Sequence, residues 1–118
     1  MERRSMEKDA FEKMRRRLIM DFLDVIFLRA LMSRPMGGHD FIAFISKRFD
    51  TLISSGTVYS TLYSMERQGL IEGGRLRAKR VYTLTPKGKE TINAVSKTEE
   101  KILSTLANIL AGRRLSGS

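Results

Sequence analysis

Residues 54–71 read SSGTVYSTLYSMERQGLI, and this stretch decides the fold. Its apolar residues recur at spacings of four and three, which predicts a helix over 55–68 with one narrow buried stripe: Val58, Leu62 and Met65. Ser54 is a suitable N-cap because its hydroxyl can accept an otherwise unpaired backbone N–H, and Gly69 fits the left-handed residue after a helix. The other face carries hydroxyls, tyrosines and one arginine, a polar surface that fits a DNA groove better than an active site.

A short basic hairpin is expected directly after this helix. Residues 70–72 and 80–85 have the composition of paired strands, with 73–79 connecting them. Residues 66–89 carry seven basic and two acidic side chains, so they hold +5 of the net charge of +9. Such a cluster attracts phosphate backbones or an anionic membrane, although a lone charge run is more often a solubilising surface. Its position beside a polar helix favours nucleic acid.

Two further helical regions precede the decisive stretch. Apolar residues at helical spacing predict one long helix over 10–33, or two helices broken near Arg17, with 1–9 frayed. Residues 34–38, RPMGG, end this region, because proline cannot continue a helix and glycine permits turn angles. A second helix is then expected over 39–49.

A long amphipathic helix is expected near the C-terminus. Thr85 suits its N-cap and Pro86 its first turn, and the helix is predicted over 87–110. Its apolar stripe consists of Ile92, Val95, Ile102, Leu103, Leu106, Ile109 and Leu110. A helix of this length has little of a small domain to pack on, so we expect it to pack on a second copy. Folding back on its own domain is the alternative.

Together these elements predict a mainly α fold with a small β-hairpin. Three helices followed by a two-stranded hairpin form the winged helix-turn-helix layout. The predicted organisation is a charged N-terminal segment and helix start at 1–17, a winged helix-turn-helix DNA-binding domain at 18–85, a C-terminal dimerisation helix at 86–111 and a disordered tail at 112–118.

Composition limits the chemistry of the chain. Its 118 residues make about one domain, and they include no cysteine and one histidine, His39. The sequence also lacks a phosphate-binding glycine loop, a metal-ligand cluster and a plausible catalytic triad. We therefore predict neither an enzyme nor a bound metal or cofactor, and we treat the lone histidine as a surface or capping residue.

Membrane insertion and secretion are not expected. The longest apolar region, 18–32, is too short for a span and is interrupted by Asp21, Asp24 and Arg29. The N-terminus is charged and lacks the continuous apolar core of a signal peptide. These features favour a cytoplasmic, nucleoid-associated protein.

Several motifs of the chain resemble those of the PadR family of bacterial and archaeal transcriptional regulators. The matching segments, within residues 22–92, are 35–40 (PMGGHD), 54–59 (SSGTVY), 62–71 (LYSMERQGLI), the basic wing 75–80 (RLRAKR) and 81–88 (VYTLTPKG). Departures occur at 37–39, where the family usually has His-Gly-Tyr, and at Ser55, Ser60 and Ala78, where proline is common.

The resemblance implies a homodimeric repressor. In the family, the last helix, helped by the N-terminal one, forms the dimer interface, and some members respond to small aromatic or phenolic effectors there. With a single expected C-terminal helix, this chain is similar to the shorter subgroup. The dimer-interface candidates are Phe11, Met14 and Leu18, together with the C-terminal apolar stripe.

Candidate DNA contacts lie on the 55–68 helix and on the wing. They are Thr57, Tyr59, Ser60, Thr61, Tyr63 and Arg67 on the helix, Arg75, Arg77, Lys79 and Arg80 on the wing, and Lys47 with Arg48 as secondary phosphate contacts. Hydroxyls and tyrosines hold phosphates, and the first residues of a recognition helix read base edges. Three alternatives stay open: an ordinary solvated face, a Tyr59 that packs within the domain, and a charged hairpin edge that guards against aggregation.

The sequence thus favours a homodimeric, sequence-specific transcriptional regulator of double-stranded DNA. The helix 55–68 would lie in the major groove, and the basic wing 73–80 on the backbone or in the minor groove. One alternative is a winged-helix protein–protein or chromatin-associated module without sequence specificity, because fold alone does not fix function. Another is a ligand sensor with an apolar pocket between subunits.

Overall fold

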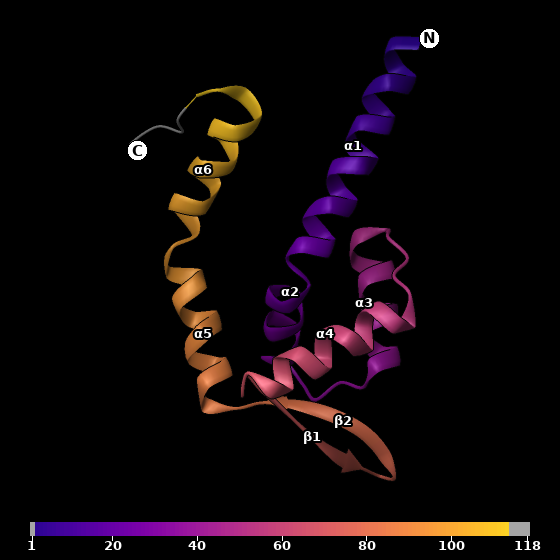
Figure 1. Ribbon diagram of the computed structural model, residues 1–118, viewed down its shortest axis with the longest axis vertical. Helices are drawn as coiled ribbons and strands as arrows, with labels where there is room; N and C mark the ends of the chain where they lie inside the picture. The colour runs from indigo at the N-terminus through magenta and orange to yellow at the C-terminus, as the bar shows by residue number, and fades with distance from the viewer. Residues whose placement is uncertain (1, 114–118) are drawn as a thin grey trace.

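The chain folds into a helical body with one β-hairpin and two projecting helical arms (Figure 1). The computed structural model describes residues 2–113. Its elements are, in order, α1 (Glu2–Asp21), α2 (Leu23–Leu31), α3 (Gly38–Phe49), α4 (Ser55–Arg67), β1 (Ile71–Leu76), β2 (Lys79–Leu84), α5 (Pro86–Lys97) and α6 (Glu99–Ala111). Helices α2 to α4 and the hairpin form the body, while α1 and α6 are the arms. The predicted mainly α fold with a small hairpin is confirmed.

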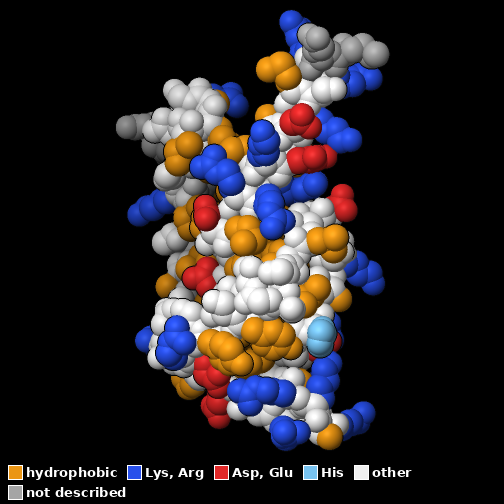
Figure 2. Space-filling model, turned by 45° about the vertical axis from the view of Figure 1, so that its right-hand side comes forward, with side chains coloured by type: hydrophobic (Ala, Val, Ile, Leu, Met, Phe, Trp, Pro, Cys, Tyr) orange, Lys and Arg blue, Asp and Glu red, His pale blue; other side chains and the backbone are white. Residues whose placement is uncertain are grey.

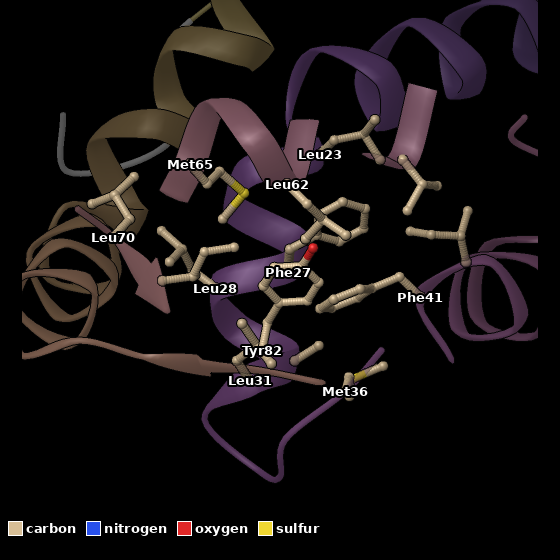
Figure 3. Close-up of a cluster of buried hydrophobic side chains, with 14 of the residues drawn as sticks. Leu23, Phe27, Leu28, Leu31, Met36, Phe41, Leu62, Met65, Leu70 and Tyr82 are labelled. Atoms are coloured by element: carbon tan, nitrogen blue, oxygen red, sulfur yellow. The ribbon is translucent and has the colours of Figure 1, made fainter. Parts of the chain in front are cut away.

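One apolar core joins α2, α3, α4 and the hairpin (Figure 3). The rings of Phe27 on α2 and Phe41 on α3 face each other with centroids 4.2 Å apart. Leu62 and Met65 of α4 and Tyr82 of β2 close around them, all at most 1% exposed. Burying each large apolar side chain stabilises the fold by about 1.5–3 kcal/mol, so this cluster fixes α4 and the hairpin in one unit.

The local signals predicted for α4 are confirmed. The hydroxyl of Ser54 accepts the backbone N–H of Thr57 at 3.2 Å, as an N-cap does. The predicted stripe of Val58, Leu62 and Met65 is fully buried. Gly69 takes a φ of 76°, the left-handed geometry expected of the residue that ends a helix.

The hairpin is longer and its turn is tighter than the sequence indicates. The antiparallel register runs from Ile71 opposite Leu84 to Leu76 opposite Lys79, so the predicted connection 73–79 lies mostly within the strands. Only Arg77 and Ala78 form the turn, with φ values of 52° and 65°. Two successive positive φ values match the right-handed twist of a two-residue hairpin, although neither residue is a glycine.

The N-terminal prediction needs correction. The helix α1 begins at Glu2, so residues 2–9 are helical rather than frayed, because this segment is rich in strong helix formers. The irregularity lies at Phe22 (φ −108°, ψ 22°) rather than near Arg17. Backbone hydrogen bonds from Phe22 to Leu18 and from Ile26 to Phe22 continue across it, so α1 and α2 meet at a kink.

The single helix predicted over 87–110 is wrong, since it is divided at Thr98 (φ −104°, ψ 13°) into α5 and α6. The Thr98 hydroxyl donates to the carbonyl oxygen of Val95 at 2.8 Å, a local bond that competes with the helical backbone. The predicted caps at Thr85 and Pro86 are confirmed. Gly112 ends α6, and positions 114–118 of the predicted disordered tail lie outside the described residues.

Candidate nucleic-acid interface

The outward face of α4 adjoins the basic hairpin. Figure 2 shows this part of the surface, where orange side chains over α4 lie above a group of blue Lys and Arg side chains. Ser60, Tyr63 and Arg67 are exposed on α4 at spacings of three and four, which places them on one face. Tyr63 is 53% exposed. Three of the six predicted α4 contacts are therefore gathered on one outward strip.

Two of the other predicted hydroxyls are engaged within the helix. The Thr57 hydroxyl accepts a hydrogen bond from Ser54 at 2.9 Å, and the half-buried Thr61 hydroxyl donates to the carbonyl oxygen of Thr57, also at 2.9 Å. Thr61 and Ser60 border a hollow of about 280 Å³ that Asp21 and Asp24 also line. Carboxylates disfavour a nearby phosphate, so Thr61 lies on the less suitable edge of α4, and Ser60 borders that edge as well.

Tyr59 packs within the domain, which was one of the two roles expected for it. Its side chain is half-buried and contacts the core. A Cβ added at Gly38, in the first turn of α3, would overlap the Tyr59 ring. The absence of a side chain at Gly38 thus makes room for the tyrosine between α3 and α4.

The four basic wing residues divide into two pairs. Arg75 and Arg77 are exposed near the turn, and Arg75 Nη1 donates to the carbonyl oxygen of Ala78 at 3.3 Å. Lys79 and Arg80 are the first two residues of β2, with Lys79 directly after the turn and Arg80 opposite Arg75, and both are paired with carboxylates of the body. The sequence predicted all four as one set, whereas in the structure Asp40 and Glu66 engage two of them, Lys79 and Arg80.

Asp40 holds Lys79. Its carboxylate accepts the Gly37 backbone N–H at 2.7 Å and two bonds from Lys79 Nζ, at 2.9 and 3.1 Å. The bond from the Gly37 N–H, followed by that from Lys79, lowers the pKa of Asp40 below its usual value of 3.8. Sequence reasoning missed this role, although the position of an aspartate in the first turn of α3 is a helix-capping signal.

Glu66 has the same relation to Arg80. Its Oε2 atom accepts the Gly73 backbone N–H at 3.2 Å and lies 3.7 Å from Arg80 Nη2. Arg80 Nε also donates to the Tyr82 hydroxyl at 3.4 Å, and its guanidinium lies 5.3 Å from the centre of that ring. The hydrogen bond to Tyr82, followed by the attraction of the nearby charges, raises the pKa of Arg80.

Lys47 belongs to a different part of the surface. It lines a hollow of about 400 Å³ with Arg34, Arg48 and Asp40. The described residues that line that hollow lie on α3 and in the loop before it, and none lies on α4. Lys47 and Arg48 therefore form a separate basic cluster with Arg34, a residue that the sequence analysis did not select.

The apolar arms carry most of the residues predicted for a dimer interface. Phe11 on α1 and four residues of α6 are exposed: Ile102, Leu103, Ile109 and Leu110. Met14, Leu18 and Leu106 are half-buried, as is Val95, which packs against the core. Ile92 is a correction: at 1% exposure it belongs to the core of its own chain, where a partner could not contact it.

A cavity of about 600 Å³ lies between the body and the C-terminal arm. Its apolar wall includes Val25, Phe44 and Ile102, from α2, α3 and α6. Its polar groups are Arg29, Arg34, Arg48, Ser33, Ser96 and Glu99. Arg29 donates to the Ser96 hydroxyl and so links α2 to α5 across it.

The described residues, 2–113, contain neither a candidate metal site nor a candidate membrane span. No group of histidine, cysteine or carboxylate side chains in that range has the arrangement of a metal site. No helix in the same range is long and apolar enough to cross a bilayer.

Comparison with known proteins identifies the family. The model of the transcriptional regulator PadR-like family matches residues 27–94. No curated protein matches the chain. The PadR-like transcriptional regulator of Bacillus cereus is similar in structure, with a TM-score of 0.70 and 22% identity over 82% of this chain and 99% of that one. A PadR family regulator of Eggerthella lenta gives a TM-score of 0.70 and 19% identity over 92% and 99% of the two chains.

Because these identities are low, the structural likeness shows the winged-helix fold alone. The family match covers more than half of the chain and therefore shows the family. The match includes most of the core, together with α3, α4, the hairpin and most of α5. The family is one of transcriptional regulators rather than enzymes. This chain belongs to the PadR-like family and is a DNA-binding transcriptional regulator.

Proposed function

We propose that this chain is a repressor that binds a palindromic DNA site as a homodimer. The observation that carries the proposal is the exposed strip of α4, Ser60, Tyr63 and Arg67, beside the exposed arginines of the hairpin turn. Hydroxyl and cationic groups on one continuous surface match the phosphates and base edges of a DNA groove.

In this proposal α4 enters the major groove, which is wide enough for one helix. The α4 terminus that Ser54 caps would approach the bases, and Arg67 at the other end would meet the backbone. Arg75 and Arg77, next to the tight turn, would contact the flanking backbone or the minor groove. Tyr59 then acts mainly by supporting α4 from within the domain.

The homodimer is supported by the apolar arms. Ile109 is 72% exposed and Phe11 is 62% exposed, on helices that project away from the body (Figure 1). A helical arm with an uncovered apolar stripe is stabilised when a second copy covers it. A two-fold dimer would place the two α4 helices about one DNA turn, ~34 Å, apart, which explains the expectation of a palindromic site. Binding at a promoter would then block transcription in the cytoplasm, on the nucleoid.

The test is binding to the DNA upstream of its own gene, measured at several fixed salt concentrations against a random duplex of equal length. We expect tighter binding to the upstream DNA and a discrete footprint with two-fold symmetry. Equal affinity for both duplexes, with no footprint, would instead favour a chromatin-associated or protein–protein module.

The cavity of about 600 Å³ supports a second role, as the site of a small aromatic effector. It is large enough for a small ligand, and it contacts both the DNA-binding body and α6, so an occupant could alter the spacing of the two α4 helices. A thermal-shift screen with planar aromatic compounds should then reveal stabilisation. If none of them raises the Tm, the chain acts without an effector of this class.

A further inference from the structure

Two carboxylates of the body hold the two basic residues at the start of β2, Lys79 and Arg80. We propose that Asp40 and Glu66 are positioning residues that take the place of DNA phosphates, keeping Lys79 and Arg80 from random DNA and fixing the hairpin against α4. Selectivity would improve because these cations become available only where DNA fits the whole surface. The inference rests on the proposed DNA binding and adds to it the control of these two side chains.

The Asp40 contact joins the hairpin to the start of α3. Lys79 Nζ bonds both oxygens of the carboxylate, while the Gly37 N–H holds the same carboxylate in place. A Cβ at Gly37 would lie 2.9 Å from the carbonyl oxygen of Arg80, so loop and hairpin backbones are in close contact. Reciprocal backbone bonds between Met36 and Tyr82, at 2.8 and 3.2 Å, strengthen the same junction.

The Glu66 contact joins the hairpin to α4 itself. One carboxylate oxygen meets both the Gly73 N–H of β1 and the guanidinium of Arg80 on β2. A Cβ at Gly73 would lie 2.9 Å from Cζ of Arg80, so the guanidinium can cover β1 only because residue 73 is a glycine. Glu66 therefore ties both strands to the helix that we place in the major groove.

Both ion pairs are partly exposed, which makes them weak enough for DNA to displace. The Lys79 and Arg80 side chains are 56% and 55% exposed. Exposed pairs contribute little to stability, whereas a phosphate contact also releases counterions. On random DNA, where the hairpin is not pressed against the backbone, the carboxylates keep these cations. At a matching site, the contacts of α4 hold phosphates close enough to compete.

Salt dependence on a random duplex tests the inference directly. Asp40→Asn and Glu66→Gln remove the charge but keep an oxygen for the Gly37 or Gly73 N–H. Each should strengthen random-DNA binding several-fold at low salt and steepen the slope of log K against log salt by about 0.9 for each freed cation in a bound copy. Glu90→Gln is the matched control, because Glu90 is an exposed carboxylate on α5 and the change in net charge is identical.

A double-mutant cycle distinguishes the pairing of Lys79 with Asp40 from a general destabilisation of the fold. Lys79→Gln alone should leave the random-DNA slope nearly unchanged, because Asp40 already occupies this ammonium. In the Asp40→Asn background the same change should return the slope to the wild-type value. A variant that only loosened the fold would not show this dependence on residue 79.

Each result decides the inference. If Asp40→Asn and Glu66→Gln change the slope no more than Glu90→Gln does, the inference is overturned, even where the wild type prefers its upstream DNA. If the wild type binds upstream and random DNA equally, the proposed sequence specificity fails, and a steeper slope in the two variants still supports the withholding of charge. A wild type that binds neither duplex contradicts both proposals.

Discussion

Gly88→Ala is expected to destabilise the fold, because α5 meets the start of the hairpin there without room for a side chain. A Cβ at Gly88 would come closer than 3.0 Å to the carbonyl oxygen of Leu70 and within 3.1 Å of Leu84 Cδ2. That carbonyl cannot move away easily, since it also accepts the Thr85 N–H at 3.2 Å. The Gly88 N–H is in turn fixed on the Thr85 hydroxyl at 3.1 Å.

The magnitude follows from two opposing terms. Overpacking against a fixed backbone costs about 1–3 kcal/mol, and the higher helix propensity of alanine returns at most about 1 kcal/mol. Because the Leu70 carbonyl oxygen would lie well inside contact distance, the cost falls in the upper part of that range, about 2–3 kcal/mol, and the net loss is about 1–2 kcal/mol. At roughly 4 °C for each kcal/mol in a chain of this size, Tm falls by about 4–8 °C. Thermal and urea unfolding at one fixed protein concentration measure it, because the Tm of the proposed homodimer would depend on concentration.

Gly56→Ala is the matched control on α4. The nearest atom to a Cβ there is Ser54 Oγ at 4.0 Å, so the methyl group meets open space. Alanine should therefore raise stability by about 0.5–1 kcal/mol through helix propensity alone. If Gly88→Ala also raised Tm, the close packing of α5 on Leu70 would be refuted.

The remaining predictions concern DNA contacts, the dimer and pH. Arg77→Ala should reduce the slope of log K against log salt by about 0.9 for each bound copy and weaken binding to all DNA sequences alike. Tyr59→Ala should weaken binding with less change in that slope. Anisotropy titrations at several salt concentrations compare the two variants, and equal slopes would contradict the assignment. Ile109→Glu places a charge on a 72% exposed residue and should give monomers by light scattering while the helical circular dichroism is kept; a persistent dimer would count against the α6 interface. The lowered pKa of Asp40 means that its stabilisation is present above the usual value of 3.8 and is lost as pH falls through the lower, folded-state value. Acid titration of stability should therefore be shallower in Asp40→Asn, and an unchanged profile would contradict the pairing.

The sequence was sufficient for α4 because all its signals are local and agree. The Ser54 cap, the buried stripe and the Gly69 stop lie within one segment, and each depends only on its neighbours in the chain. The kink at Phe22 was predicted at the wrong position, and the break at Thr98 was not predicted, because no local signal marks either one. Apolar periodicity continues through both positions, and hydrogen bonds such as Ile102 N–H to the Thr98 carbonyl oxygen carry the helix pattern across.

The sequence predicts which segments form the candidate site, but not which side chains contact one another within it. Charge density identified the hairpin as the basic segment, and helical spacing identified the outward face of α4. Which cations are paired depends on tertiary contacts, such as that of Lys79 with a carboxylate 39 residues earlier in the chain. Neither composition nor periodicity contains that information, because both describe residues that are close in sequence.

The ion pairs formed by tertiary contacts change where the positive charge of residues 66–89 is free to meet DNA. Their net charge of +5 already subtracts Glu66 and Glu72. That sum does not show where the Glu66 carboxylate lies. It lies against Arg80 and Gly73, and Asp40, outside that segment, lies against Lys79. Two of the four wing cations, Lys79 and Arg80, are thus paired with carboxylates. In the proposed complex Arg75 and Arg77 would contact the backbone flanking α4, while the two ion pairs hold the angle between the hairpin and that helix.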